Sequence, residues 1–326
     1  MSTFPDRHRS DFDVVGAGSL GDILWRDPAG DDVLWLMNNN TPSTIATLPR
    51  VTPDWHFKAA ADFDVTGDGD ADILWQNDNG ALALWQMEGT TVNAVHALPN
   101  PGASAHVVGD NDFNEDSADD ILFQNDNGSL AIWTITDAGV PTISGMFAGT
   151  QNPGPTWHVV GTGDTTGPTE AAGILWQNDN GALALWNHAT FAAGTFTFNT
   201  VAALPTVDPS WHVKGMQNIN GGGDFTADVV FQNDNGAVVV WEMGGATGTT
   251  ITSANLININ PGPAWHIVGL RDMDQDAQID ILFQNDNGAA AIWEDYQSLG
   301  GGSATFNTVL AIDPNPNPNG HVWDLL

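Results

Sequence analysis

The sequence DILWQNDNGALALWQM, residues 72–87, decides the fold, because versions of it recur six times along the chain. Its two aromatic positions always lie ten residues apart, whereas successive repeats are separated by 48 to 55 residues. Insertions have therefore been accepted between these units and not inside them. In chain order, repeats one to six carry the pairs Trp25 and Trp35, Trp75 and Trp85, Phe123 and Trp133, Trp176 and Trp186, Phe231 and Trp241, and Phe283 and Trp293.

Each unit is predicted to be a β-hairpin. Two short runs of aliphatic and aromatic residues flank the sequence Asn-Asp-Asn-Gly, and Asn-Gly is a strong signal for a tight primed turn. In residues 72–87 the turn centres on Asn79 and Gly80, which tolerate the positive φ that such a turn needs. A slip of one residue would send each aromatic to the opposite face of the sheet, so the turn fixes the register.

The whole chain shows four short β-like segments in each repeat and no long helical periodicity. Radial repetition of such units is typical of a β-propeller, in which neighbouring blades cover both faces of each sheet. The sequence therefore predicts an all-β protein, a six-bladed β-propeller of four-stranded antiparallel blades in a single domain. After a lead of residues 1–10, the blades are assigned to residues 11–50 plus 320–326, 54–99, 105–148, 156–205, 210–258 and 264–313.

The two ends of the chain look complementary. Repeat one lacks an opening strand of the Trp-His type, and residues 320–326 supply one with no repeat after it. We therefore predict that the C-terminal strand joins blade 1 and closes the ring, since an unpaired apolar edge strand invites aggregation. In a competing register, residues 13–17 are the first strand of repeat one and the C-terminal strand is extra.

The charge balance points away from nucleic acid. Forty acidic and 7 basic residues give a net charge of −33. Only five of the acids are glutamate, so the excess is aspartate, the residue of turns and of loops that bind hard cations. A halophile-like acidic surface is the alternative explanation.

Other features of the composition concern location and stabilisation. The chain has no cysteine, so metal binding could take the place of disulfides in a secreted fold. It has no apolar run of about 18 residues, which predicts no membrane span. The first ten residues contain no apolar core of a secretory signal, so either they are trimmed, or the protein is cytoplasmic, or export is encoded elsewhere.

Three repeats place the motif D-x-[DNT]-x-D-x-x-x-D immediately before the hairpin. Oxygen-bearing side chains at alternate positions of a tight loop converge on one point, as calcium with its 6–8 oxygen ligands requires. The sequence therefore predicts about three calcium sites that stabilise the fold, with metal-free Asx turns as the alternative. The expected ligands are Asp64, Thr66, Asp68, Asp70 and Asp72 in repeat two, Asp112, Asn114, Asp116 and Asp120 in repeat three, and Asp272, Asp274, Asp276 and Asp280 in repeat six.

The corresponding loops of the other repeats have lost ligands. Repeat five keeps Asn220, Asp224 and Asp228 and is a doubtful fourth site. Repeat four has Gly173 at the last ligand position, and repeat one has Ala17 where a ligand is expected. These two loops are predicted to be empty.

The succession W-H-V-V-G, D-x-N-x-D-x-x-x-D and I-L-F resembles the FG-GAP/VCBS repeat family of calcium-binding β-propellers, which includes the heads of integrin α-subunits. The resemblance covers residues 11–326. It implies structurally important calcium loops and an extracellular role in binding or adhesion; some relatives are sugar-binding lectins and others are accessory domains of enzymes. The degenerate loops of repeats one, four and five, and a blade count below that of integrin heads, depart from the family pattern.

The pentapeptide Gln-Asn-Asp-Asn-Gly recurs in five repeats and forms a ring of amides and carboxylates suited to a polar ligand. Turn chemistry with interblade hydrogen bonds from Gln is the favoured explanation. The third-strand tryptophans are expected to form interblade core, and the repeated histidines to be core residues donating to a neighbouring strand. The possible ligand face comprises Gln76, Asp78, Gln124, Asp126, Gln177, Asp179, Gln232, Asp234, Gln284 and Asp286.

The sequence shows no catalytic set. It has no cysteine, no nucleophile-elbow pattern and no phosphate-binding glycine loop that opens a helix. We therefore expect a calcium-binding, non-catalytic binding or adhesion module, extracellular by family resemblance, with a carbohydrate or a protein as ligand. The alternatives are a multivalent carbohydrate-binding lectin and a polysaccharide-active enzyme or its accessory domain; six similar faces also suit self-association.

Overall fold

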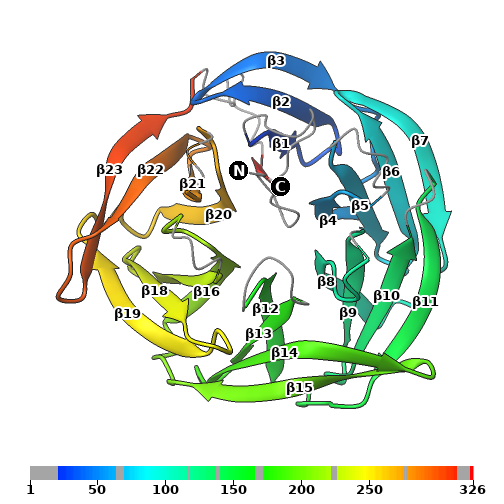
Figure 1. Ribbon diagram of the computed structural model, residues 1–326. Helices are drawn as coiled ribbons and strands as arrows, with labels where there is room; N and C mark the ends of the chain where they lie inside the picture. Colours follow the sequence, from blue (N-terminus) through cyan, green and yellow to red (C-terminus); the bar gives the residue numbers. More distant parts are fainter. Residues whose placement is uncertain are drawn as a thin grey trace, which may run out of the picture.

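The computed structural model describes residues 21–63, 70–116, 118–136, 140–165, 172–221, 226–274, 276, 278–313 and 324–325. These residues form an all-β structure with 24 strands in four sheets, arranged as a ring (Figure 1). In this described part of the chain, no helix is long and apolar enough to cross a membrane.

Two of the sheets have four strands. The first has the order β24 (Asp324–Leu325), β1 (Ile23–Arg26), β2 (Asp32–Asn38) and β3 (Thr41–Thr47). The second has the order β4 (Trp55–Ala61), β5 (Asp72–Asn77), β6 (Leu82–Glu88) and β7 (Thr91–Leu98). They correspond to repeats one and two.

The other two sheets have eight strands. The sheet of repeats three and four has the order β12 (Trp157–Gly163), β13 (Gly173–Asn178), β14 (Leu183–Ala192), β15 (Thr195–Leu204), β11 (Thr142–Gly149), β10 (Leu130–Thr136), β9 (Asp120–Asn125) and β8 (Ala105–Asn111). The sheet of repeats five and six has the order β16 (Trp211–Gln217), β17 (Asp228–Asn233), β18 (Val238–Gly244), β19 (Thr250–Ile257), β23 (Ser303–Ala311), β22 (Ala290–Ser298), β21 (Asp280–Asn285) and β20 (Trp265–Arg271).

The prediction of a six-bladed β-propeller of separate four-stranded blades is therefore wrong. Fourth strands of adjacent repeats pair in parallel, β11 with β15 through Ala148 and Thr195, and β19 with β23 through Leu256 and Ser303. The physical reason is hairpin length. Strands β14 and β15 have 10 residues each and β22 and β23 have 9, so their shared ends reach past their own repeat to the fourth strand of the preceding one.

Each eight-stranded sheet also folds back toward itself. Its two end strands lie side by side, β8 beside β12 and β16 beside β20 (Figure 1). The hydroxyl of Thr162 donates to the carbonyl of Asp110 over 2.9 Å, which links β12 to β8. The approach is close, because a Cβ on Gly109 would lie 2.7 Å from the Thr162 methyl carbon.

The C-terminal strand behaves as the sequence predicts. Strand β24 pairs antiparallel with β1, aligning Leu325 with Trp25 and Asp324 with Arg26. The expectation that the end of the chain joins repeat one is confirmed, and the competing first strand at residues 13–17 lies outside the described residues. The residue ranges assigned to the individual blades stay predictions.

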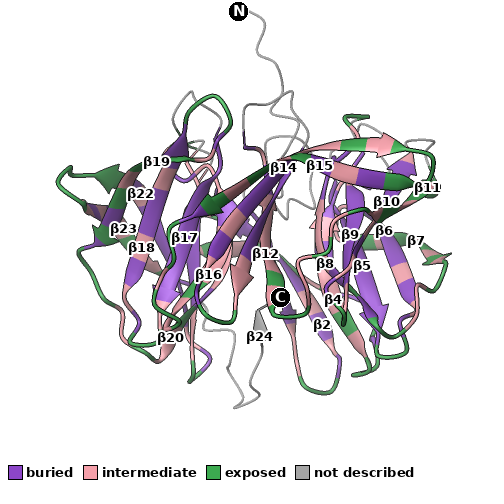
Figure 2. Cartoon of the chain, turned by 90° about the horizontal axis from the view of Figure 1, so that it is seen from below, coloured by how far each residue is buried: buried purple, intermediate pink, exposed green. Residues whose placement is uncertain are grey.

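The predicted hairpin forms at the centre of each repeat, but its turn is not the predicted two-residue primed turn. In repeat two, β5 and β6 align Ile73 with Trp85 and Gln76 with Leu82, so the turn has three residues, 78–80, and of these Gly80 has positive φ, 88°, whereas Asn79 does not. All six third-strand tryptophans are buried, which confirms their assignment to the core. Trp75 and Trp85 pack with ring centroids 5.3 Å apart, and their cluster includes Leu24 of repeat one. Buried residues follow the middle strands of the sheets (Figure 2).

Candidate functional site

The strongest candidate site is the acidic loop between β20 and β21 in repeat six. Asp272, Asp274 and Asp276 each contribute one carboxylate oxygen, and the three oxygens lie within 4.8 Å of one another. We call these residues the acidic triad. Among the residues that the structure describes, no other three acidic or histidine side chains converge so closely. The triad runs from buried at Asp272 to exposed at Asp276, so one side of it is open to solvent.

The loop is shaped by its own side chains. The amide of Asp276 donates to Asp274 over 3.2 Å, and the amide of Gln278 donates to Asp276 over 2.7 Å, so each carboxylate curls the backbone behind it. The amide of Met273, a buried residue, donates to the carboxylate of Asp280 over 2.7 Å. This bond fastens the start of the loop to its end and leaves the triad on the outside.

The electrostatics of the loop are unfavourable when no cation is bound. Burial raises the pKa of Asp280 to about 9, and the charge of Asp274 adds to this effect. Burial and then the charge of Asp276 raise the pKa of Asp274. Glu294 of β22, which the sequence interpretation missed, has a pKa raised to about 7 by burial first and by Asp274 next. Its signal in the sequence is an acid directly after the third-strand tryptophan of a repeat that keeps all four aspartates of the motif.

In repeat three the predicted ligands share one loop but bond to each other. The amide of Asp116 donates to Asp112 over 3.1 Å, and the side-chain amide of Asn114 donates to Asp116 over 3.1 Å. Burial raises the pKa of Asp120 to about 8. The loop is therefore organised by Asx turns and keeps the acidic character that a cation would neutralise.

The predicted ligands of repeats two and five are only partly described. Asp64, Thr66, Asp68 and Asp224 lie outside the described residues. Asp70 accepts a hydrogen bond from the amide of Gly89 over 2.6 Å. Asn220 lies in the described part of the repeat-five loop, before Asp228 at the start of β17.

The last aspartate of the motif has a structural function of its own. In repeat three, Asp120 accepts from the amides of Phe113 in the loop and Ile135 in the third strand. Asp228 accepts in the same way from Ile219 and Met243. In repeat one, Asp22 likewise accepts from Met37 over 3.0 Å. This anchoring explains why repeat one keeps the aspartate although Val15 and Ala17 occupy other ligand positions of its loop.

At the opposite end, which we call the turn end, the repeated glutamines join neighbouring repeats. The side-chain amide of Gln76 donates to the carbonyl of Ala105 over 2.7 Å, and its oxygen accepts from the amide of Val107 over 3.0 Å. Gln124, Gln177 and Gln232 make the same pair of bonds to the repeats that follow them. The favoured explanation, interrepeat hydrogen bonds from Gln, is confirmed at these four positions.

The turn aspartates pair with the repeated histidines, and here the sequence interpretation was wrong. The histidine rings are 51–55% exposed rather than buried in the core, and each Nε2 bonds to the turn aspartate of its own repeat. The physical reason is that the second residue of each first strand faces outward beside the hairpin turn. The pairs are His56 and Asp78, His106 and Asp126, His158 and Asp179, His212 and Asp234, and His266 and Asp286, at 2.7 to 2.8 Å.

A polar cavity of about 250 Å³ lies at the turn end between repeats four and five. His158 and Asp179 contribute one wall, and Pro209 and His212 of the next repeat contribute another. A cavity with imidazole and carboxylate groups can hydrogen-bond to hydroxyl or amide groups of a small polar ligand.

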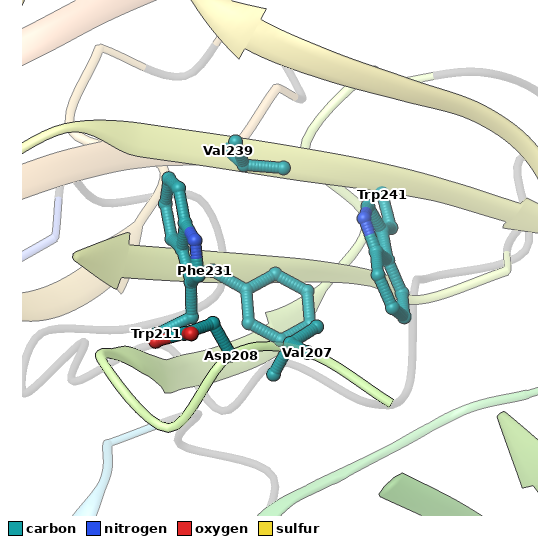
Figure 3. Close-up of a pocket in the computed structure, with 6 residues that line it drawn as sticks. All are labelled: Val207, Asp208, Trp211, Phe231, Val239 and Trp241. Atoms are coloured by element: carbon teal, nitrogen blue, oxygen red, sulfur yellow. The ribbon is translucent and has the colours of Figure 1, made fainter. Parts of the chain in front are cut away.

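A second cavity of about 250 Å³ lies within repeat five and is mainly apolar. Val207, Trp211, Val239 and Trp241 line it, and Figure 3 shows the Phe231 ring between the two indoles. Asp208 supplies the single carboxylate, whose pKa is lowered by hydrogen bonds from Ser210. Such a cavity suits a small apolar group with a polar edge.

Comparison with known proteins gives no assignment of this site. No family model matches the chain, and no curated protein matches it.

Proposed function

We propose that the protein is a calcium-binding, non-catalytic binding module that works outside the cell. The observation that supports this most is the convergence of three carboxylate oxygens within 4.8 Å in the acidic triad. Carboxylate oxygens in a short loop with one open side are the ligands that calcium prefers, and extracellular calcium modules bind it at about 10⁻⁴–10⁻³ M. The motif resemblance to FG-GAP/VCBS repeats agrees with this proposal.

The ligand-binding part of the proposal rests on the turn end. Five exposed histidine–aspartate pairs repeat there, and the polar cavity between repeats four and five includes members of two of them. Repeated polar groups of one kind suit a ligand with repeated hydroxyl groups, so multivalent carbohydrate binding is the second candidate function.

Calcium titration of chelator-treated protein tests the proposed function. We expect heat of binding by calorimetry and a rise in melting temperature, because a ligand that binds only the folded state stabilises it by about 2.7 kcal/mol at a hundredfold excess over Kd. Asp276→Asn keeps the turn acceptor but removes one charge, and it should remove or weaken one site. Asp313→Asn, which removes a charge from an exposed residue outside the acidic loops, is the control.

Two results would contradict the proposal. One is an absence of binding heat together with an unchanged melting temperature when calcium is added. The other is an equal loss of binding in Asp276→Asn and Asp313→Asn, because a general effect of net charge would then explain the titration.

A further inference from the structure

Glu294 of β22 is a buried carboxylate. Its residue is only 2% exposed, and its Oε1 oxygen has no hydrogen-bond donor among the described groups. A buried carboxylate oxygen without a donor costs free energy, because the water that it gave up on folding has not been replaced. The unfavourable free energy of this burial arises at Glu294 in β22.

The backbone directly after Glu294 is left-handed. Strands β22 and β23 keep one register through this point, aligning Glu294 with Thr308 and Tyr296 with Phe306, and Asp295 between them has φ of 62°. Asp295 is held in this conformation by the hydroxyl of Thr308, which donates to its carboxylate over 2.5 Å.

The acidic triad and Glu294 influence each other electrostatically. The charges of Asp274 and Asp276 raise the pKa of Glu294, and the charge of Glu294 contributes to the raised pKa of Asp280. Strands β21 and β22 align Ile281 with Trp293, and the same register sets Glu294 opposite Asp280, the last aspartate of the loop. Glu294 therefore lies at the position of β22 that borders the end of the acidic loop.

The equivalent position is satisfied by protein groups in other repeats. Glu242 of repeat five accepts from the side-chain amide of Asn255 over 3.0 Å and from the hydroxyl of Tyr296 over 2.9 Å. Thr134 of repeat three shares a hydrogen bond with Ser144 over 2.7 Å. Repeat six has an acid at this position, and its described residues supply no such donor to the Oε1 oxygen, which is the arrangement expected when the partner is a cation.

We propose that Glu294 is a ligand of the repeat-six cation, so that this site is assembled from two segments, the loop of residues 272–280 and strand β22. The inference rests on the proposed calcium-binding function. A ligand from the third strand ties the loop to the hairpin, and an additional carboxylate raises the affinity for calcium and for trivalent lanthanides. Repeat six then binds more tightly than repeat three, where Thr134 offers no charge.

The test isolates repeat six in the full chain. A background protein with Asp68→Asn and Asp116→Asn weakens the sites expected in repeats two and three. Glu294→Gln in this background removes the charge with little change in shape, and we expect calcium affinity to fall by about tenfold or more. Glu242→Gln makes the same change at the same strand position of repeat five and should leave the affinity unchanged.

Hydration of bound terbium gives a second readout. Luminescence lifetimes in H₂O and D₂O report the number of water molecules on the ion, and Glu294→Ala should add about one, because a lost protein ligand is replaced by solvent. Glu294→Gln serves as the readout of affinity if the alanine variant fails to fold by circular dichroism.

The outcomes separate the two proposals. Equal calcium affinity and equal terbium hydration in the background protein and its Glu294 variants would overturn the role of Glu294 and leave the calcium site standing. A background protein that binds neither calcium nor terbium would overturn both the repeat-six site and the proposed function behind it.

Discussion

Repeats four and six have the same hairpin, but they differ at the loop end, which is the end of each repeat opposite the turn end. Both align the first residue of the aliphatic run with the third-strand tryptophan, Ile174 with Trp186 and Ile281 with Trp293. In repeat six the loop end carries the acidic triad, Asp280 and Glu294. In repeat four the positions of Asp280 and Glu294 are taken by Gly173 and Asn187.

In the described part of repeat four, neutral hydrogen bonds join the loop end to repeat five. The side-chain amide of Asn187 donates to the hydroxyl of Thr165 over 3.1 Å and to the carbonyl of Thr247 in repeat five over 2.8 Å. Gly248 packs so closely that a Cβ on it would lie 1.7 Å from the Thr165 carbonyl oxygen. The comparison shows that neutral hydrogen bonds to a neighbouring repeat can take the place of acidic side chains, whereas repeat six keeps its carboxylates close together.

The most disruptive test gives repeat four the aspartate that repeat six has. A Cβ on Gly173 would lie 2.4 Å from the methyl carbon of Thr165, and the new carboxylate would be buried without a cation. We expect Gly173→Asp to lower the free energy of unfolding by about 3 kcal/mol or more, measured by urea denaturation.

Two further variants separate the steric contribution to this loss of stability from the contribution of the buried charge. Gly173→Ala carries the steric part alone, and Thr165→Ala added to Gly173→Asp removes the steric conflict and leaves the buried charge. If Gly173→Asp is as stable as the original chain, the loop end of repeat four is not the close-packed neutral structure described above.

A pH series in chelator tests the acidic repeat. The pKa of Asp280 is raised from 3.8 to about 9 and that of Glu294 from 4.5 to about 7. The folded protein therefore holds protons that the unfolded chain has already released, and stability should fall by about 4 kcal/mol from Asp280 alone between about pH 5 and about pH 8, at about 1.36 kcal/mol per pH unit. Calcium should reduce this fall, because it takes the place of the protons.

The variant Asp280→Asn sharpens the pH test. It removes the group with the largest raised pKa in repeat six, so the stability of the calcium-free variant should depend less on pH. A calcium-free protein whose stability is flat or rises over this range would show that the loop carboxylates are not strained by burial.

The smallest effect is expected at the turn end, where the two repeats agree. The pairs His158 with Asp179 and His266 with Asp286 have nearly the same length and are about half exposed. Asp179→Asn and Asp286→Asn should each change the free energy of unfolding by less than about 1 kcal/mol, and by similar amounts, in chemical denaturation. A large loss in only one of them would mean that the turn ends also differ.

Local signals in the sequence were sufficient for the hairpins and the core. The turn at Asn79 and Gly80 sets the register, and a constant spacing from that turn identifies the buried tryptophans. Joining of the sheets was not predicted, because it depends on hairpins β14–β15 and β22–β23 extending beyond their own repeat, and strand length is poorly encoded in loops of varied composition.

The candidate site shows the same division between local and distant information. The acidic triad follows from alternate aspartates in one short loop. Glu294 lies in a different strand, and only the pairing of β22 with β21 sets it opposite Asp280 at the end of that loop. The outward direction of His56 depends on the register between β4 and β5, which aligns it with Gln76 next to the turn.

The parallel pairing of fourth strands lowers the symmetry of the molecule. Six copies in the sequence do not give six equivalent outer rims, because β11, β15, β19 and β23 use one another as partners. Among the described strands, β3 and β7 are the fourth strands that end a sheet and leave an edge unpaired. Each parallel pairing joins only the ends of its two strands, through two residues of each, so the outer edges of these four strands are shortened rather than removed.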